Sequence, residues 1–577
     1  MQIAQRPHLS EPSDLSEYPA ILQRIYAARG LTKVSQLDSR LQTLLPFNTL
    51  IDIDKACRRL EEALRYEERI IVIGDFDADG ATSTALAISA LKSMGAKQVN
   101  FLVPNRFEFG YGLTSGIVEV AKKMEPKLII TVDNGISNVE GVDTANEAGI
   151  DVIITDHHLP SDTVPKAYAI VNPNQVNDPF PSKSIAGVGV IFYVMLALRR
   201  HLASTDWFTK NGLAEPNMAQ FLDLVALGTV ADVVALDQNN RILVKQGLAR
   251  IKQGFGRPGI NALIKVAGRE AQRLKESDLG FAVAPRLNAA GRLQDMSIGI
   301  ECLMSDNDAH ALELALRLDE LNKERRIIET EMKDQALINI NQLISKIEKG
   351  KELPVALCLM DSSWHQGVIG ILAGRLKERY HRPTIIFAKV GDEELKGSAR
   401  SVSSINIRDI LAAVDRDNPG LINKFGGHAM AAGLSIHPAA LSDFQSAFLR
   451  EVEKFLDPSA CVGKQLTDGP LSADEFTLQT ALLIQEAGPW GQHFPEPSFD
   501  NVLEIVDQRV VGQNHLKLTF SLPNSDKILD GIAFNVDREL WPNYRVKEAH
   551  VAYRLDVNVY QGRSRLQLMV EVLNPLL

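Results

Sequence analysis

The sequence predicts an α/β protein with two α/β lobes joined by a long helix around a central cleft, followed by a C-terminal β-barrel of the OB type. Short β-branched runs alternate with helical segments from Ile70 onward. An unbroken helical pattern extends from Asp308 to about Ile347. Short, evenly spaced strand patterns begin at about Phe499. The 577 residues fit three or four domains at about 150 residues each.

The first predicted lobe, residues 51–305, follows a polar, helical lead-in over residues 1–50. Its strand-like runs RIIVIG, QVNFLVP, KLIITVD, DVIITD and YAIVNP alternate with helical segments, which indicates a parallel sheet. Binding and catalytic sites in such sheets form at the carboxyl ends of the strands. The residues directly after these runs are therefore the first candidates for chemistry.

The long helix, residues 306–350, would reach about 60 Å if unbroken and would act as a spacer. A second α/β lobe over 351–456 contains PVALCLMD, TIIFAKV, KGSARSV and FGGHAMAAGLSI. Residues 457–577 form the predicted barrel, built from five alternating runs. Its aromatic side chains can stack on bases, but alternation indicates that most of them fill the barrel core: Phe520, Phe534, Trp541, Tyr544, Tyr553 and Tyr560.

Composition excludes several classes of protein. The 45% hydrophobic and 23% charged residues are typical of a folded globular chain, not of a disordered or collagenous one. Four widely spaced cysteines without a CxxC motif argue against disulfide frameworks and zinc knuckles, and fit the cytoplasm. The start has no apolar signal core, and the apolar run from Ile185 to Leu198 is too short to span a bilayer. We expect that run to be a buried helix and the protein to have no membrane contact.

Charge is distributed unevenly along the chain. The net charge is −10, yet residues 241–275 hold nine Lys/Arg against one acid, Glu270, a local charge of +8 that leaves −18 elsewhere. Such a stretch can track nucleic-acid phosphates, or it can be a solvated helical face. The charge pattern favours neither interpretation over the other.

Three carboxylates, Asp75, Asp77 and Asp79, follow the first strand in VIGDFDADG. Their spacing of two crowds negative charge into a small volume, which favours bound cations. The string resembles a calcium loop, but its twelfth position is Leu86 instead of Glu and a strand precedes it. The remaining alternative is a solvated turn in which an aspartate caps the next helix.

Further strand ends carry metal-ligand types. Asp133 follows LIITV, and Asp156, His157 and His158 follow DVIIT. Asp232, in the apolar run ALGTVADVV, is expected to be a fourth strand end, where an unpaired carboxylate would be costly. Oxygen ligands with an imidazole favour Mg²⁺ or Mn²⁺ over Zn²⁺. About five carboxylates call for two ions, the arrangement used in phosphoester hydrolysis.

These motifs resemble a known family. GDFDADG, TVDNG, the DHH triplet at 156–158 and ALGTVADVV are similar to the successive motifs of DHH phosphoesterases, and GSARS with FGGHAMAAG is similar to their DHHA1 companion domain. APRLNAAGR, SSWHQGVIG, the long helix and the terminal barrel are similar to the bacterial RecJ group, the single-strand-specific 5′→3′ exonucleases. The resemblance spans nearly the whole chain, which is identified as a member of that group.

The resemblance implies a metal-dependent 5′→3′ exonuclease that degrades single-stranded DNA to 5′-mononucleotides with two Mn²⁺ or Mg²⁺ ions. It implies that Asp156 orients a histidine and that His158 faces the scissile phosphate. The implied metal ligands are Asp75, Asp77, Asp79, Asp133, His157 and Asp232.

The resemblance also implies residues that hold the strand. A pocket for the terminal 5′ phosphate would contain Arg106, Ser398 and Arg400, because arginine donates two parallel hydrogen bonds to phosphate. A second set would lie against the phosphodiester backbone: Gly426, Gly427 and His428. Arg286 and Arg375 would grip phosphates, or would pair with acids on helix faces.

The family further implies a monomer that acts in recombination and repair with a single-stranded-DNA-binding protein and a helicase. Two other functions remain open from the residues alone. One is a phosphodiesterase for short oligoribonucleotides or cyclic dinucleotides, which would not need the basic stretch, the long helix and the barrel. The other is a single-strand-binding scaffold without hydrolysis, which the full set of acidic positions disfavours.

Overall fold

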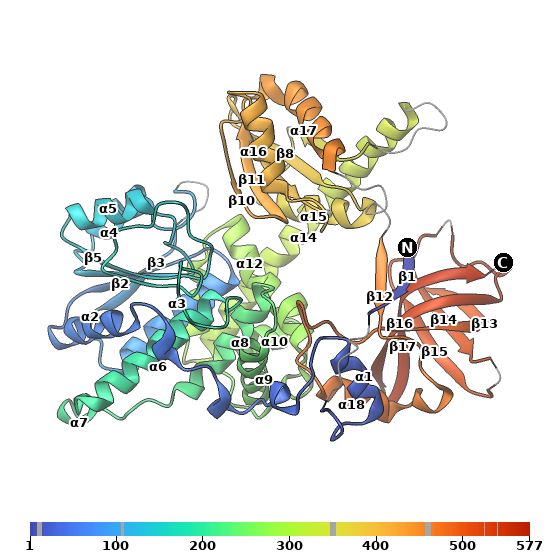
Figure 1. Cartoon of the computed structure of the whole chain (residues 1–577), viewed down its shortest axis with the longest axis horizontal. Coiled ribbons are helices and arrows are strands. Elements are labelled where there is room, and N and C mark those ends of the chain that lie inside the picture. The colour runs from blue at the N-terminus through green and yellow to red at the C-terminus, as the bar shows by residue number, and fades with distance from the viewer. Residues whose placement is uncertain are drawn as a thin grey trace. The chain divides into compact units, whose positions relative to one another are not determined.

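The structure is a computed structural model that describes residues 1–7, 14–104, 109–346, 354–455, 463–523, 525–538 and 540–576 (Figure 1). The chain divides into two compact units. Unit 1 contains Met1–Ala4 and Lys323–Leu466, and unit 2 contains Gln5–Asn322 and Thr467–Leu577. The C-terminal barrel therefore belongs to the same unit as the first predicted lobe.

Unit 2 is organised around a five-stranded sheet of order β3-β2-β4-β5-β6, in which every neighbouring pair is parallel. The core strands β2 and β4 are fully buried because helices cover both faces. The strands are β2 (Ile70–Gly74), β3 (Val99–Leu102), β4 (Leu128–Val132), β5 (Asp151–Thr155) and β6 (Ala169–Val171).

Alternate residues of these strands face two different cores. Ile70 and Val72 pack with the helices α2 (Ile53–Arg65), α3 (Ala78–Ser93) and α6 (Gly187–Ser204). Ile71 and Ile73 pack with α4 (Ser115–Lys122) and α5 (Val139–Glu147). The sheet is thus doubly covered, as the alternating pattern predicts.

Helix α6 contains the apolar run predicted to be a buried helix. It is the one helix in the described ranges that is long and apolar enough to cross a membrane, but 67% of it is buried in the protein. It packs against α3 and α8 (Leu222–Ala231) in the main core, so the prediction of a buried helix is confirmed.

A helical region follows in unit 2. After α7 (Trp207–Lys210), its elements are α8, α9 (Gln238–Lys252), α10 (Pro258–Val266), α11 (Glu276–Asp278), a π-helical turn η6 (Leu279–Val283), α12 (Ala284–Leu293) and α13 (Ser297–Met304). The predicted basic stretch lies along α9, α10 and the turns after them.

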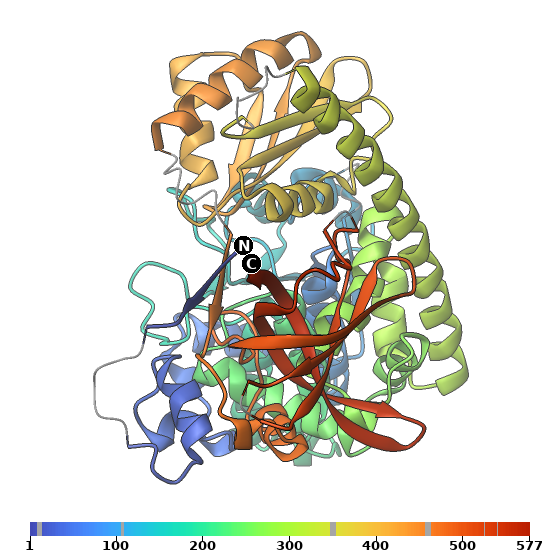
Figure 2. The same ribbon diagram turned by 90° about the vertical axis from the view of Figure 1, so that its right-hand side faces the viewer.

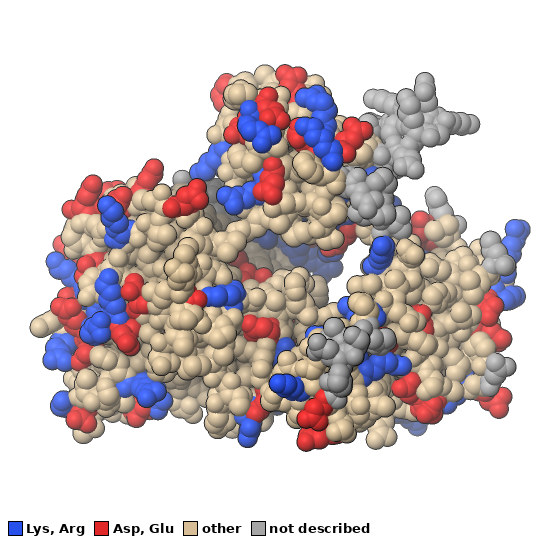
Figure 3. All heavy atoms as spheres, viewed as in Figure 1, with Lys and Arg blue, Asp and Glu red and all other residues tan. Residues whose placement is uncertain are grey.

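Much of that basic charge is used within the fold. Arg241 donates to the carbonyl oxygens of Leu236 and Gln36. Ion pairs engage four more of its cations: Arg257 with Asp223, Arg269 with Asp278, Arg273 with Glu270, and Lys275 with Asp556. On the face displayed in Figure 3, acidic and basic side chains are interspersed. For Arg241, Arg257 and Lys275 the structure favours a structural role, whereas Arg269 and Arg273 keep at least half of their side-chain surface exposed.

The predicted long helix is α14 (Asp308–Lys346), 39 residues long, which Figure 2 shows as a single continuous helix. Unit 1 begins within it, at Lys323. The sheet of unit 1 has the order β10-β11-β9-β8-β7, and only the β7–β8 pair is parallel. Its strands are β7 (Leu357–Asp361), β8 (Thr384–Val390), β9 (Glu394–Arg400), β10 (Lys424–Gly427) and β11 (Ala431–Ile436).

Helices cover both faces of this second sheet as well. On one face α14 and α15 (Ile369–Tyr380) pack against Leu357 and Ile386. On the other face α16 (Ile407–Asp417) and α17 (Leu441–Phe455) pack against Ile385 and Phe387.

The C-terminal strands close into a five-stranded barrel in the order β13-β14-β15-β17-β16, as predicted. Phe520, Trp541 and Tyr553 are buried, whereas Phe534 and Tyr544 are exposed. The side chain of Tyr560 lies outside the described residues. The strands are β13 (Phe499–Val511), β14 (His515–Ser521), β15 (Ile528–Ala533), β16 (Glu548–Tyr560) and β17 (Arg563–Leu576), and α18 (Leu478–Glu486) precedes them.

Residues 1–50, predicted to be a helical lead-in, also contain a strand. A strand, β1 (Gln2–Gln5), pairs with β12 (Lys464–Thr467), and only then does α1 (Ala20–Ala27) follow. Arg29, just after α1, forms a buried ion pair with Asp468 at 2.7 Å. The N-terminal residues are therefore anchored to the segment that leads into the barrel.

Candidate metal centre

The carboxyl end of β2 runs directly into the helix α3 and carries three aspartates there. Asp75 is buried. Asp77 is the N-cap of α3, and its Oδ1 accepts hydrogen bonds from the backbone N–H groups of Asp79 and Gly80 at 2.9 and 3.0 Å. The alternative in which one aspartate caps the helix is thus partly correct, because capping uses only one oxygen of Asp77.

Asp79 is held by a second helix. Its Oδ2 accepts from the N–H of Gly187 at 2.7 Å, and its Oδ1 accepts from the N–H of Val188 at 3.0 Å, both at the start of α6. A helix N-terminus stabilises negative charge there. Burial, followed by the charge of Asp77, nevertheless raises the pKa of Asp79 to about 7.

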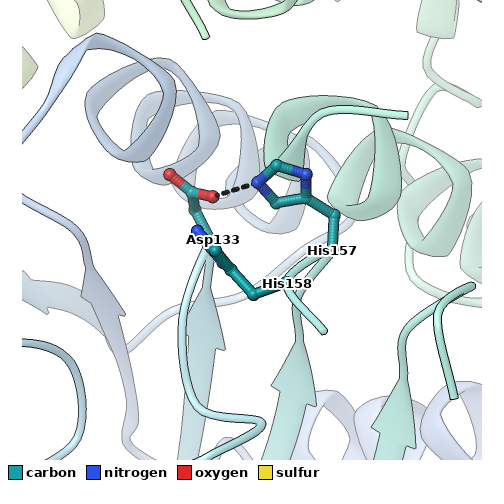
Figure 4. A group of neighbouring side chains, drawn as sticks. All are labelled: Asp133, His157 and His158. Atoms are coloured by element: carbon teal, nitrogen blue, oxygen red, sulfur yellow. Dashed lines mark ion pairs between the residues drawn. The ribbon is translucent and has the colours of Figure 1, made fainter. Parts of the chain in front are cut away.

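Asp133 and His157 meet at the ends of the neighbouring strands β4 and β5 (Figure 4). Nε2 of His157 lies 3.1 Å from Oδ1 of Asp133. Within the described ranges this Oδ1 accepts no hydrogen bond, although it is buried. Burial, followed by the charges of Asp79 and Asp77, raises the pKa of Asp133 well above its usual value. A buried acceptor among like charges fits a cation.

Asp156 orients His158. Its Oδ1 lies 2.7 Å from Nδ1 of His158 and accepts the backbone N–H groups of His157 and His158, while its Oδ2 accepts the N–H of Ile136. Burial alone would lower the pKa of His158, but the hydrogen bond and charge of Asp156 outweigh it and raise the pKa to about 9. Asp156 therefore favours the protonated form of His158 at neutral pH.

Asp232 reaches the same centre from a helix, so the prediction that it lies at a fourth strand end is wrong. It is the C-cap residue of α8, whose run LDLVALGTVA is apolar because the helix is buried all round. Its Oδ2 lies 3.5 Å from Nε2 of His157. The pKa of Asp232 is raised well above its usual value, first by burial and then by the negative charges of Asp79 and Asp77.

The ligand atoms of seven predicted residues form three overlapping groups, each with its atoms within 4.8 Å of one another. Two of these groups share no residue: Asp75, Asp77 and Asp133 form one, and Asp79, His157 and Asp232 form the other. The third group joins Asp133 with His157 and His158. The donor set, carboxylate oxygens with one or two imidazoles, fits Mn²⁺ or Mg²⁺.

Tyr111 also contacts the centre and was missed by the sequence analysis. Its hydroxyl donates to the backbone carbonyl of Asp133 at 3.0 Å. Its ring meets the rings of His158 and Phe76 edge-on, with centroids 5.8 and 6.0 Å away. One sequence feature could have pointed to Tyr111 as a site residue: it lies between Gly110 and Gly112, after the carboxyl end of β3.

The predicted phosphate-binding residues of unit 1 lie next to the start of α15. Nη1 of Arg400 donates to Oγ of Ser398 at 3.2 Å. A Cβ on Gly370, in the first turn of α15, would lie 3.0 Å from Nη2 of Arg400 and 3.1 Å from Oγ of Ser398. Burial lowers the pKa of the Arg400 guanidinium. The guanidinium of Arg400, the hydroxyl of Ser398 and the N-terminus of α15 are therefore adjacent. Arg106 lies outside the described residues.

Gly426 and Gly427 are in register with these residues. Gly426 pairs with Gly433 of β11, which pairs with Ser398 of β9, so the three share one face of the sheet. A Cβ on Gly426 or on Gly433 would have no atom within 4 Å, which leaves this face open. Gly427 has φ +142°, a backbone conformation that favours glycine. His428 follows and is exposed.

The two remaining arginines pair with acids on α14. Nη2 of Arg286 lies 2.7 Å from Oδ1 of Asp319, and its Nη1 donates to the carbonyl of Ala282. Nε of Arg375 lies 3.2 Å from Oε1 of Glu329. For both, the contacts correspond to the second of the predicted alternatives, pairing with acids on helix faces.

Comparison with known families agrees with this geometry. Residues 69–229 match the DHH family, N-terminal domain, residues 352–454 match the DHHA1 domain, and residues 467–572 match the RecJ OB domain. A parallel sheet with acids and histidines at its strand ends, together with these matches, defines a phosphoesterase of the DHH class.

Individual relatives are more specific. The single-stranded-DNA-specific exonuclease RecJ of Dickeya dadantii is 51% identical over 576 residues, 100% of this chain and 99% of that protein. That of Escherichia coli is 51% identical over 573 residues, 99% of each. The crystal structure of Thermus thermophilus RecJ with Mn²⁺ has a TM-score of 0.80 at 29% identity, over 99% of this chain and 79% of that one. The chain belongs to the RecJ family and is an exonuclease specific for single-stranded DNA.

Proposed function

We propose that this exonuclease degrades single-stranded DNA from its 5′ end, with two Mn²⁺ or Mg²⁺ ions, and releases 5′-mononucleotides. Thermus thermophilus RecJ has been crystallised with Mn²⁺ and with Mg²⁺. The observation that carries the proposal is the convergence of acidic and imidazole ligands at one edge of the unit 2 sheet.

The two ligand groups that share no residue support two ions. Asp75, Asp77 and Asp133 would hold one, and Asp79, His157 and Asp232 would hold the other. When bound, the ions would lower the cost of forming the attacking hydroxide and of developing charge on the leaving oxygen. The raised pKa values of Asp79, Asp133 and Asp232 express the like-charge repulsion that such cations relieve.

His158 would donate to the phosphate under attack. Asp156 favours its protonated form and contacts Nδ1, and Nε2, which lies 3.4 Å from the Tyr111 hydroxyl, would donate to a phosphate oxygen. The ring of Tyr111 packs edge-on against the imidazole of His158 and helps to fix its orientation. These three residues would position a donor, while the acids bind the ions.

The site beside the start of α15 supports the 5′ polarity. A terminal phosphate carries more negative charge than an internal phosphodiester. Arg400, Ser398 and the N–H groups at the helix start supply a cation and neutral donors for it. The open face at Gly426 would admit the backbone of the following nucleotide.

The protein would act as a monomer in the cytoplasm, in recombination and repair, with a single-stranded-DNA-binding protein and a helicase. These partners rest on the family alone.

The test is nucleotide release from 5′-labelled and 3′-labelled oligonucleotides in Mn²⁺. Asp133→Ala should abolish release, and Asp143→Ala, an exposed acid on α5, should not. Arg400→Ala should slow a 5′-phosphorylated strand more than a 5′-hydroxyl strand, with Arg408→Ala on α16 as the control. Early release of the 3′ label, or full activity of Asp133→Ala, would refute the proposal.

A further inference from the structure

Phe281 is an exposed aromatic side chain on an unusual element. It lies in the π-helical turn η6, and 88% of its surface is accessible. Its neighbours Leu279, Ala282 and Val283 are buried, so the turn itself is anchored in the core. Single π-helical turns are rare and occur often at functional sites. Phe281 therefore presents its ring to solvent from a turn whose other side chains are packed in the core.

This turn packs against α8, the helix that ends at the predicted metal ligand Asp232. Gly280 packs against Val230 of α8, two residues before Asp232, because a Cβ there would lie 3.2 Å from Cγ1 of Val230. The helix α12, which continues from the turn, contacts the start of α3, where Oδ1 of Asn288 accepts the N–H of Ala78 at 2.8 Å. The turn is thus tied at one end to the helix that carries Asp232, and through α12 to the start of α3.

Val233 is a second exposed apolar residue at this edge. It follows Asp232 directly, and 63% of its surface is accessible. Its φ of +61° is a left-handed conformation that is costly for a β-branched side chain. Its N–H donates to the carbonyl of Val230 at 3.3 Å, so it ends α8 where glycine is the common residue. Strain kept next to the metal ligands indicates that the side chain serves a purpose other than stability.

From these positions we infer that Phe281 and Val233 contact the unpaired bases of the strand being degraded, with Phe281 stacking on a base and Val233 packing beside the nucleotide at the metal centre. The inference rests on the exonuclease activity. Single-stranded DNA is the occupant that fits, because its base faces are exposed, Val233 directly follows the predicted metal ligand Asp232, and the turn that carries Phe281 packs against the same helix. In a duplex those faces are covered, so these contacts would favour single strands without selecting a sequence.

The first experiment removes the ring and the bases separately. On a natural 5′-phosphorylated strand, Phe281→Ala should lower kcat/KM about 5- to 150-fold, the range for loss of one base–aromatic stack. On a strand with abasic residues in place of the first few nucleosides, its effect should nearly vanish, because the phosphates remain but no base is left to stack. Phe281→Tyr should retain activity on the natural strand.

The matched control is Phe255→Ala, which removes another exposed phenylalanine of unit 2, 60% accessible, next to Arg250. It should leave both substrates unaffected. An equal loss for Phe281→Ala on natural and abasic strands would overturn the stacking role, and so would no loss on either. Neither result would alter the exonuclease assignment, which Asp133→Ala tests independently.

The second experiment separates strain from substrate contact at Val233. Val233→Gly should raise the midpoint of thermal unfolding in EDTA, because glycine relieves the left-handed strain, and should lower kcat/KM on the natural strand several-fold. Val233→Ala should lower kcat/KM as well, without the same gain in stability. Wild-type kcat/KM in both variants would overturn the role of Val233.

Discussion

The substitution Asp79→Asn should make the metal-free protein more stable and less sensitive to pH. The folded protein raises the pKa of Asp79 from 3.8 to about 7. Three units at 1.36 kcal/mol each correspond to about 4 kcal/mol of destabilisation above pH 7. Both carboxylate oxygens accept backbone N–H groups, so the amide of Asn would lose one of these bonds at about 1–3 kcal/mol. The net gain should be about 1–3 kcal/mol.

The sign of the pH dependence of the free energy of unfolding follows from how many protons the folded and unfolded states bind. Between pH 3.8 and about 7 the folded state holds the Asp79 proton and the unfolded state has lost it. The free energy of unfolding of the wild type should therefore fall as pH rises through this window and level off above it. In Asp79→Asn the free energy of unfolding should lack this contribution to its decrease with rising pH.

The assay is urea unfolding in EDTA at intervals from pH 4 to pH 9. Asp143→Ala provides the matched control, since it removes an exposed acid of the same unit. Adding Mn²⁺ should restore stability to the wild type more than to Asp79→Asn. Parallel pH profiles for wild type and Asp79→Asn in EDTA would refute the reasoning.

Two further substitutions test other parts of the account. Gly427→Ala should destabilise unit 1 by about 1–3 kcal/mol, because its φ is +142° and a Cβ would lie 2.4 Å from the carbonyl of Ala431; an unchanged urea midpoint would contradict this. Asp156→Asn removes the charge that raises the pKa of His158 to about 9, so the pKa should fall toward 6.5. The alkaline limb of the kcat/KM profile should then move down by about 2 pH units, and a limb that stays in place would show that protonated His158 is not required.

Much of the centre could be predicted because a parallel sheet brings its strand ends to one edge. Asp75, Asp133 and His157 each follow a short apolar run, and the sheet order places their strands side by side. The local motif and the topology therefore led to the same cluster.

Asp232 and Tyr111 show where sequence patterns were insufficient. A fully buried helix and a buried strand are both continuous apolar runs, so the run before Asp232 did not distinguish them. Tyr111 acts through a hydroxyl bond to a backbone carbonyl and an edge contact with a ring. Neither contact leaves a periodic signal in the sequence.

The cations were the least predictable group. Arg286 and Arg375 find their acids on α14, at separations of 33 and 46 residues that no local pattern reveals. Arg257 likewise pairs with Asp223, far from the local charge run. The charge of a stretch can be counted from the sequence, but its free charge depends on tertiary partners.

The most direct test of the central claim is a crystal structure soaked with Mn²⁺, with the ions located by anomalous scattering. The account predicts two peaks, one among Asp75, Asp77 and Asp133 and the other among Asp79, His157 and Asp232. Peaks elsewhere in unit 2, or none in crystals whose dissolved protein still degrades single-stranded DNA in Mn²⁺, would contradict it.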